Sequence, residues 1–211
     1  MKPLHLIIAI GAMCAVVAAS NYLVQFPVQG SLGALNLADL LTWGAFTYPA
    51  AFLVTDLTNR RFGPAKARQV VFAGFVIAVI LSVVLATPRI AIASGTAFMV
   101  AQLLDVLVFD KLRKAVWWRA PLVSSFAGSA IDTLLFFSIA FAASLPMFGP
   151  NDNFAITNAP LLGLFGAEAP RWVSWALGDF AVKLLMALVM LAPYRVLRSL
   201  VDRIGSRPAA A

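Results

Sequence analysis

Residues 69–87 read QVVFAGFVIAVILSVVLAT, a stretch of nineteen residues without one charged side chain. A helix rises about 1.5 Å per residue, so this stretch can cross most of the roughly 30 Å hydrocarbon core of a bilayer. Blocks of similar character flank it at residues 4–26, 38–57, 90–110, 121–145 and 172–192. Unbroken apolar runs are unlike the alternating pattern of a membrane barrel. We therefore predict an all-α membrane protein with six transmembrane helices in one integral domain, residues 1–211.

The composition agrees with this prediction. Hydrophobic residues make up 62% of the 211 residues, and charged residues only 12%. A soluble domain of this size would have too few polar side chains to cover its core. Turn-forming residues collect between the apolar blocks instead, as in GSLG at 30–33 and PMFGPN at 146–151.

The net charge of +7 is concentrated in alternate connecting segments. The basic residues between blocks two and three, between blocks four and five, and after block six are Arg60, Arg61, Lys66, Arg68, Lys111, Arg113, Lys114, Arg119, Arg195, Arg198, Arg203 and Arg207. This alternation follows the positive-inside rule and predicts cytoplasmic amino and carboxyl termini in a bacterial inner membrane. The same charges face anionic lipid, so no nucleic-acid partner is needed to explain them.

The first block has a second interpretation, as a cleaved secretory signal. Lys2, an apolar run and the small residues Ala18, Ala19 and Ser20 imitate such a signal with its cleavage site. The apolar stretch continues to residue 26, however, and is long enough to span, so we expect it to be retained. Because the chain holds one Cys and one His, we expect no disulfide, no metal and no other cofactor.

Ionisable residues inside the apolar blocks are the strongest functional signal, and they are Asp56, Asp105, Asp132, Asp179 and Lys183. Each costs about 2.5–3.5 kcal/mol at the centre of a membrane helix. A protein that only had to reside in a membrane would gain by replacing them. We therefore predict a polar site between the helices.

Some of these residues also have a structural interpretation. Asp56 could pair with Arg60 one turn later, and Asp179 could neutralise Lys183 at i,i+4. Asp132 has no such neighbour on its own helix and lies about 18 Å from the predicted cytoplasmic end of that helix. We expect Asp132 to contact a substrate.

Two helices share a spacing of polar and aromatic residues. Gln102 lies three residues before Asp105, and Phe109 lies four residues after it; Ser129, Asp132 and Phe136 repeat the pattern. The spacing puts a polar group, a carboxylate and an aromatic ring on one helix face. Such a face suits a flat, hydrogen-bonding ligand better than a metal ion.

Several stretches, in order, resemble the queuosine precursor transporter family, which is also called the vitamin uptake transporter family. The stretches are YPAAFLVTD at 48–56, FG at 62–63, ARQVVFAGF at 67–75, Arg89, AS at 93–94, AF at 97–98, Gln102, Asp105, Phe109, Arg119, DT at 132–133, Phe136, Lys183 and PY at 193–194. They cover most of the chain. Arg60 departs from the family pattern, where an acidic residue is expected, and Ser129 stands where a glutamine is expected.

The resemblance implies six helices similar to the substrate-binding subunits of energy-coupling-factor importers. It also implies uptake of 7-deazaguanine precursors of queuosine: the cyano base (preQ0), the aminomethyl base (preQ1) or queuine. The residues expected to bind such a base are Asp132, Asp105, Gln102, Asp179, Lys183, Phe109, Phe136 and Asp56. Carboxylates and the amide would meet the hydrogen-bonding edge, and the two phenylalanines would stack on the ring.

Three other functions compete with this one. The protein could be a substrate-capture subunit that needs an ATPase module. The module would then dock on the stripe of small residues on the first helix, Gly11, Ala15 and Ala19. A homo-oligomer is also possible. Residues 177–180 (LGDF) are similar to part of the intramembrane aspartyl protease motif, but the Tyr-Asp pair of those enzymes is absent. A purely structural membrane protein would leave the buried aspartates without a use.

Overall fold

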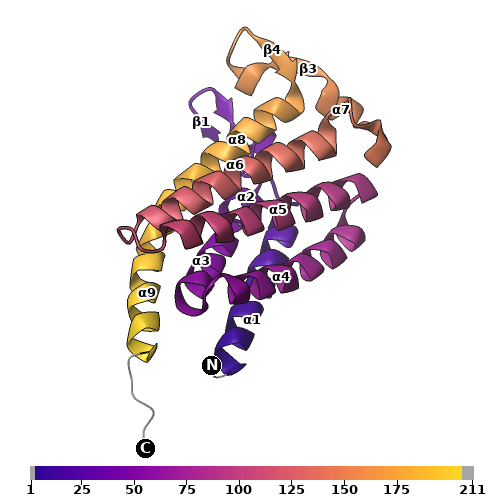
Figure 1. Cartoon of the computed structure of the whole chain (residues 1–211). Coiled ribbons are helices and arrows are strands. Elements are labelled where there is room, and N and C mark those ends of the chain that lie inside the picture. Colours follow the sequence, from indigo (N-terminus) through magenta and orange to yellow (C-terminus); the bar gives the residue numbers. More distant parts are fainter. Residues whose placement is uncertain (1–2, 206–211) are drawn as a thin grey trace, which may run out of the picture.

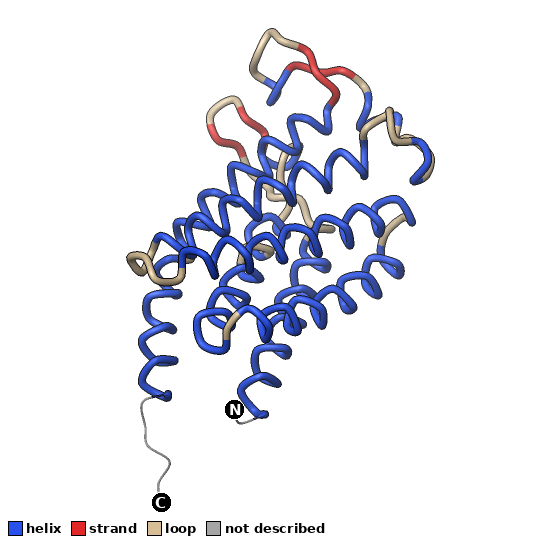
Figure 2. The backbone as a smooth tube through the Cα atoms, viewed as in Figure 1, coloured by secondary structure: helices blue, strands red, loops and turns tan. Residues whose placement is uncertain are grey.

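The computed structural model describes the backbone of residues 3–205 and the side chains of residues 4–200. Helices form almost all of it, and two short hairpins lie together at one end (Figure 2). The elements are α1 (Pro3–Leu23), β1 (Ser31–Leu32), β2 (Leu35–Asn36), η1 (Leu37–Asp39), α2 (Trp43–Thr47), α3 (Ala50–Phe62), α4 (Pro64–Leu85), α5 (Pro88–Leu112), α6 (Arg119–Phe141), η2 (Pro146–Phe148), α7 (Asn153–Ile156), β3 (Asn158–Pro160), η3 (Leu161–Gly163), β4 (Glu168–Pro170), α8 (Arg171–Val189) and α9 (Leu191–Gly205).

Five helical stretches of the described residues are long and apolar enough to cross a membrane. They are Leu4–Leu23, Pro64–Leu85, Pro88–Leu112, Arg119–Phe141 and Arg171–Leu200. Their outward faces carry large exposed apolar side chains, among them Phe72, Val84, Phe126 and Leu134. A surface of this kind aggregates in water but matches the hydrocarbon of a bilayer. The chain is therefore a multi-pass membrane protein.

The predicted single helix over residues 38–57 is wrong in its details. Residues 37–39 form a turn of 3₁₀ helix, and the block is then divided into α2 and α3 at Tyr48 and Pro49. Pro49 has no N–H to continue the hydrogen-bond ladder. At 13 residues, or about 20 Å, α3 is too short to span the hydrocarbon by itself.

The other five predicted helices are present, with shifted ends. The third begins at Pro64 rather than residue 69, and the fifth ends at Phe141 rather than residue 145. The sixth ends at Val189, and α9 then extends to Gly205 with the basic carboxyl-terminal residues. The helical turns at the membrane interface are polar, so the hydropathy pattern does not show where the helix ends beyond its apolar part.

Long antiparallel helices form the body of the molecule (Figure 1). The most extensive contact joins α5 and α6; α4 and α3 pack beside α5, α1 packs on α4 and α3, and α8 packs on α6. Both ends of the described chain lie at one end of the bundle, and the hairpins β1–β2 and β3–β4 lie at the other (Figure 1). The buried apolar core lies between α1, α3, α4 and α5 and includes Met13, Val17, Ala51, Val70, Val71, Phe98 and Val106.

Two glycines permit the close packing of α3. Gly63 takes a φ of +81°, which lets the chain reverse between α3 and α4, and Pro64 follows at the first position of α4. Gly128 of α6 lies against Phe52 of α3: a Cβ atom there would be 2.7 Å from Phe52 Cε1 and 3.3 Å from the Ala101 carbonyl oxygen. A side chain at position 128 would therefore push α6 away from α3 and α5.

Candidate functional site

A large cavity of about 910 Å³, with a charged inner end and mostly apolar walls, lies between α1, α2, α4, α5, α6 and α8. It extends from Asp132 and Lys183 in the interior to the loops at the hairpin end of the bundle, where Asn36 and Arg171 line it. Its volume lies in the range of small-molecule binding pockets.

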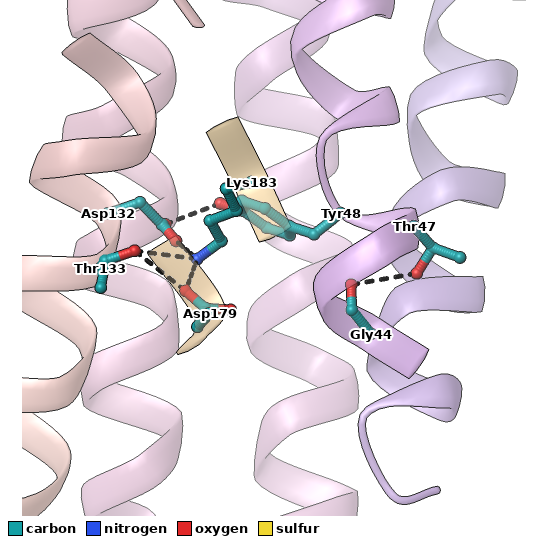
Figure 3. Close-up of polar contacts among 7 residues, drawn as sticks. All are labelled: Gly44, Thr47, Tyr48, Asp132, Thr133, Asp179 and Lys183. Atoms are coloured by element: carbon teal, nitrogen blue, oxygen red, sulfur yellow. Dashed lines mark hydrogen bonds and ion pairs between the residues drawn. The ribbon is translucent and has the colours of Figure 1, made fainter. Parts of the chain in front are cut away.

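Three charged side chains form the inner end of this cavity (Figure 3). Lys183 Nζ of α8 lies 2.7 Å from Asp132 Oδ2 of α6 and 2.5 Å from Asp179 Oδ2, one turn earlier on α8. The Thr133 hydroxyl donates to Asp179 Oδ2 at 2.9 Å. Asp132 and Lys183 are only 5% and 4% exposed, so these charges are withdrawn from water and depend on one another.

Tyr48, which lies between α2 and α3, also contacts this group of charged side chains. Its hydroxyl donates to Asp132 Oδ1 at 2.9 Å, and Lys183 Nζ lies 5.3 Å from the centre of its ring (Figure 3). Both oxygens of Asp132 therefore have a partner in the protein. The interruption at Pro49 allows the backbone to place Tyr48 here, because a regular helix would continue past the cavity instead.

The charges and walls of the inner cavity define what it can hold. Two carboxylates and one ammonium leave a net charge of −1, which favours a ligand with N–H donors or a positive charge. Phe136 and Trp175 line the wall above the charges, and Arg171 lies 4.3 Å over the ring of Phe154 nearer the loops. Flat aromatic surfaces beside hydrogen-bonding carboxylates suit a planar heterocycle.

The structure separates the eight predicted site residues into two groups. Asp132, Asp179, Lys183 and Phe136 line the cavity together. The remaining four, which are Asp105, Gln102, Asp56 and Phe109, do not line it. Phe109 packs edge to face on Tyr194, with ring centres 6.4 Å apart. The other three lie between α3 and α5, towards the end of the bundle that carries the termini.

Sequence reasoning did not select Tyr48, Ser94, Asn21 or Trp175 as site residues, although all four line the cavity. Tyr48 had a signal: it directly precedes Pro49 inside the motif at 48–56. A helix interruption in a membrane segment is tolerated where it is buried or faces a wet cavity. Applying that rule to the neighbouring residue would have identified Tyr48.

Three arginines, which are Arg60, Arg89 and Arg113, bind backbone carbonyl oxygens and do not line the cavity. Arg60 donates to the Arg113 carbonyl, and Arg113 donates to the Arg60 carbonyl at 3.3 Å; the alternative in which Arg60 pairs with Asp56 is wrong, since Asp56 accepts from Ser124 instead. Arg89, 3% exposed, donates to four carbonyl oxygens, the shortest of them Ala142 at 2.6 Å, and to Asn151 Oδ1. Arg89 thus fastens the start of α5 to the loop after α6.

A helical membrane bundle with a charged, aromatic-walled cavity between its spans is the arrangement of a small-molecule transport protein. The chain belongs to the putative vitamin uptake transporter family, whose sequence pattern matches residues 42–87 and 80–197. The protein is accordingly a member of a transporter family and not an enzyme.

Named relatives are similar over most of the chain. The probable queuosine precursor transporter of Haemophilus influenzae is 36% identical over 205 residues, covering 84% of this chain and 79% of the relative. The queuosine precursor transporter of Escherichia coli is 36% identical over 199 residues, with the same coverage. The probable queuosine precursor transporter of Bacillus subtilis is 25% identical over 181 residues, covering 72% of this chain and 69% of the relative. No solved structure matches the chain.

Proposed function

We propose that this protein imports a queuosine precursor, a 7-deazaguanine base, across the inner membrane of a bacterium. The buried group of Asp132, Asp179 and Lys183 at the inner end of a 910 Å³ cavity is the observation that carries the proposal. The names of the relatives supply the substrate class. The imported base would serve the salvage of queuosine for tRNA modification.

The chemistry of the cavity matches the edge of a deazaguanine. Adjacent N–H donors on the pyrimidine ring can donate to one carboxylate, for which Asp132 is the best placed. The ring carbonyl can accept from Lys183, which already lies between the two carboxylates. Phe136 and Trp175 can contact the ring faces. An aminomethyl group would add a cation, and the net charge of −1 at the inner end favours it.

We infer a topology of six crossings with both termini in the cytoplasm. Five crossings are the apolar helices, and α2 with α3 together supply the sixth, since residues 43–62 rise about 30 Å. The basic loops then lie at the cytoplasmic side and the two hairpins at the outer side. In this orientation the cavity reaches the outer loops, as an importer that receives its substrate from outside requires. The whole chain acts as one integral membrane domain.

A second candidate function is that of a substrate-capture subunit of an ATP-driven importer. Gly11, Ala15 and Ala19 lie exposed along one face of α1, and a Cβ atom added at Gly11 would meet nothing within 4 Å. Stripes of small residues allow close helix packing, so this face suits a partner helix. The partner would be a coupling subunit or a second copy of the chain. Uptake in a host that lacks the ATPase module distinguishes the two functions.

Complementation of queuosine synthesis tests the proposal. A host that cannot make or import deazaguanines would express the chain and receive each base separately, and queuosine in its tRNA would be measured. We expect at least one base to restore queuosine. If none does so despite confirmed membrane expression, the proposed function fails. The Lys183→Met variant is the matched negative control, because it removes the shared cation.

A further inference from the structure

A second group of buried polar side chains lies between α3 and α5, outside the cavity. The Thr55 hydroxyl donates to Gln102 Oε1 at 2.7 Å, and Asn59 Nδ2 donates to the Val106 carbonyl at 2.9 Å. Between these two contacts, the carboxyl groups of Asp56 and Asp105 lie close enough to hydrogen-bond to each other. Both aspartates are at most 1% exposed.

No positive charge compensates this pair of carboxyl groups among the described ion pairs. Arg60, one turn after Asp56, donates to the Arg113 carbonyl instead. Lys183 of α8 is held by the two cavity aspartates. Helix α6 brings serine hydroxyls to the pair rather than a charged group, and Ser124 donates to Asp56 Oδ1 at 3.2 Å. Helices α1 and α4 present apolar residues, and α9 presents Tyr194.

Two carboxylates in contact and away from water cannot both remain ionised, because each disfavours the charge of the other. One proton held between them removes one charge and supplies the hydrogen bond that joins them. Neither oxygen of Asp105 has a donor of its own among the described residues: the hydroxyl within its reach, that of Ser124, already donates to Asp56 Oδ1. A proton on the Asp56 carboxyl is therefore the donor that Asp105 has available.

Further atoms around the pair also lack partners among the described residues. Gln102 Nε2 and Asn59 Oδ1 are unbonded, and both residues are fully buried. Both lie one turn from an aspartate of the pair, on the same α3–α5 interface. A cavity of about 10 Å³, the size of one water molecule, adjoins Asp56 and is lined by Ser125 and Tyr194. A donor, an acceptor and room for one water are what exchange of a proton requires.

We propose that Asp56 and Asp105 form a proton-binding site, separate from the cavity, that couples substrate import to a proton gradient. This inference rests on the proposed function as a transporter. The proton taken up from outside bridges the two carboxyl groups and holds α3 to α5. Its release to the cytoplasm leaves two adjacent carboxylates, whose repulsion separates the helices. The same proton thus enters from one side and leaves at the other.

Helix α5 lines the cavity as well as this site, and α3 is linked to the cavity through Tyr48. Tyr48, which donates to Asp132, directly precedes Pro49 and α3, so a displacement of α3 moves the hydroxyl that holds Asp132. On α6, Ser124 and Asp132 lie eight residues, or about 12 Å, apart. The close contact of Gly128 with Phe52 lies between them and transmits the displacement.

Transport by purified protein in liposomes tests the coupling. The membrane potential is set to zero, the outside is made one pH unit more acidic, and radiolabelled preQ0 is supplied because it is uncharged. The wild-type protein should accumulate it up to about tenfold, the limit for one proton per molecule at this gradient. Asp56→Asn and Asp105→Asn should abolish accumulation but retain exchange of labelled for unlabelled base without a gradient. Asp110→Asn, on the same helix as Asp105 but paired with Arg113, is the matched control and should behave as wild type.

Each outcome bears on one proposal. Exchange without any response to the pH gradient, or accumulation driven by sodium, overturns the proton site and leaves the transport function standing. No exchange by the wild type with any of the three bases overturns the transport function itself. Loss of exchange in both variants overturns the coupling role, because it places the pair in substrate movement. Infrared spectroscopy adds a test without substrate: a protonated-carboxyl band at neutral pH should vanish in the double variant Asp56→Asn/Asp105→Asn, and its full persistence there contradicts a proton on this pair.

Discussion

Substitution of Asp132 by Asn is the most direct test of the cavity as a binding site. The side chain keeps its size, but one of the two oxygens that now accept from Tyr48 and Lys183 becomes an amide nitrogen, so one of these two hydrogen bonds is lost. The new amide group donates, so it opposes the N–H donors of the substrate. We expect weaker binding with intact membrane insertion, since removal of a buried charge favours insertion.

The magnitude follows from the contacts that the substitution changes. A charge-assisted hydrogen bond contributes about 1.5–3 kcal/mol, and an unsatisfied donor facing another donor adds about 1 kcal/mol. A loss of about 2–4 kcal/mol corresponds to a 30- to 1000-fold increase in Kd. The free energy of unfolding falls by less than the binding free energy, because Lys183 keeps its ion pair with Asp179 at 2.5 Å.

Equilibrium binding of radiolabelled base to purified protein measures this effect independently of any driving force. Asp110→Asn makes the same chemical change at a partly exposed position outside the cavity, and we expect its Kd within about threefold of wild type. An Asp132→Asn protein with wild-type affinity would refute the reasoning and remove Asp132 from the substrate site.

Three further predictions concern the scaffold. Gly128→Val should lower the free energy of unfolding by about 1–3 kcal/mol, because the new Cβ would lie 2.7 Å from Phe52 Cε1. A thermal midpoint in detergent equal to that of the wild type would contradict the close packing. Arg89→Gln should lower the free energy of unfolding by about 2–4 kcal/mol and increase proteolysis of the loop at 142–152. The shorter Gln side chain has fewer donors and cannot form all five hydrogen bonds of the arginine. In intact cells, an impermeant thiol reagent should label Cys introduced at Asn153 and spare Cys at Lys66, and the reverse pattern would invert the topology.

The long apolar helices could be predicted from the sequence because hydrocarbon imposes one length and one composition on each of them. The segment at 38–57 could not, since its apolar composition is the same whether the helix is continuous or interrupted. Pro49 indicated a distortion, but the separation into α2 and α3 depends on the burial of Tyr48 against Asp132. That contact joins residues 84 positions apart.

The repeated spacing on α5 and α6 shows where site prediction reaches its limit. Asp105 and Asp132 occupy similar faces of their own helices, which suggested one common site. The helices are antiparallel, however, so the second half of α5 and the second half of α6 lie at opposite ends of the bundle (Figure 1). Charges within a span are visible in a sequence, but their depth relative to another helix is set by packing.

The reciprocal contact of Arg60 and Arg113 has a consequence for how this protein can vary. Each guanidinium binds a main-chain oxygen of the opposite segment, and Arg113 also pairs with Asp110 one turn earlier on its own helix. Every residue type carries that oxygen, so no substitution of an acceptor can open the contact, and a change of ionic strength weakens it less than it would weaken an ion pair. Only the two arginines themselves can be lost. Close relatives are therefore free to change most neighbouring side chains at this end of the bundle while α3 and α5 stay fastened.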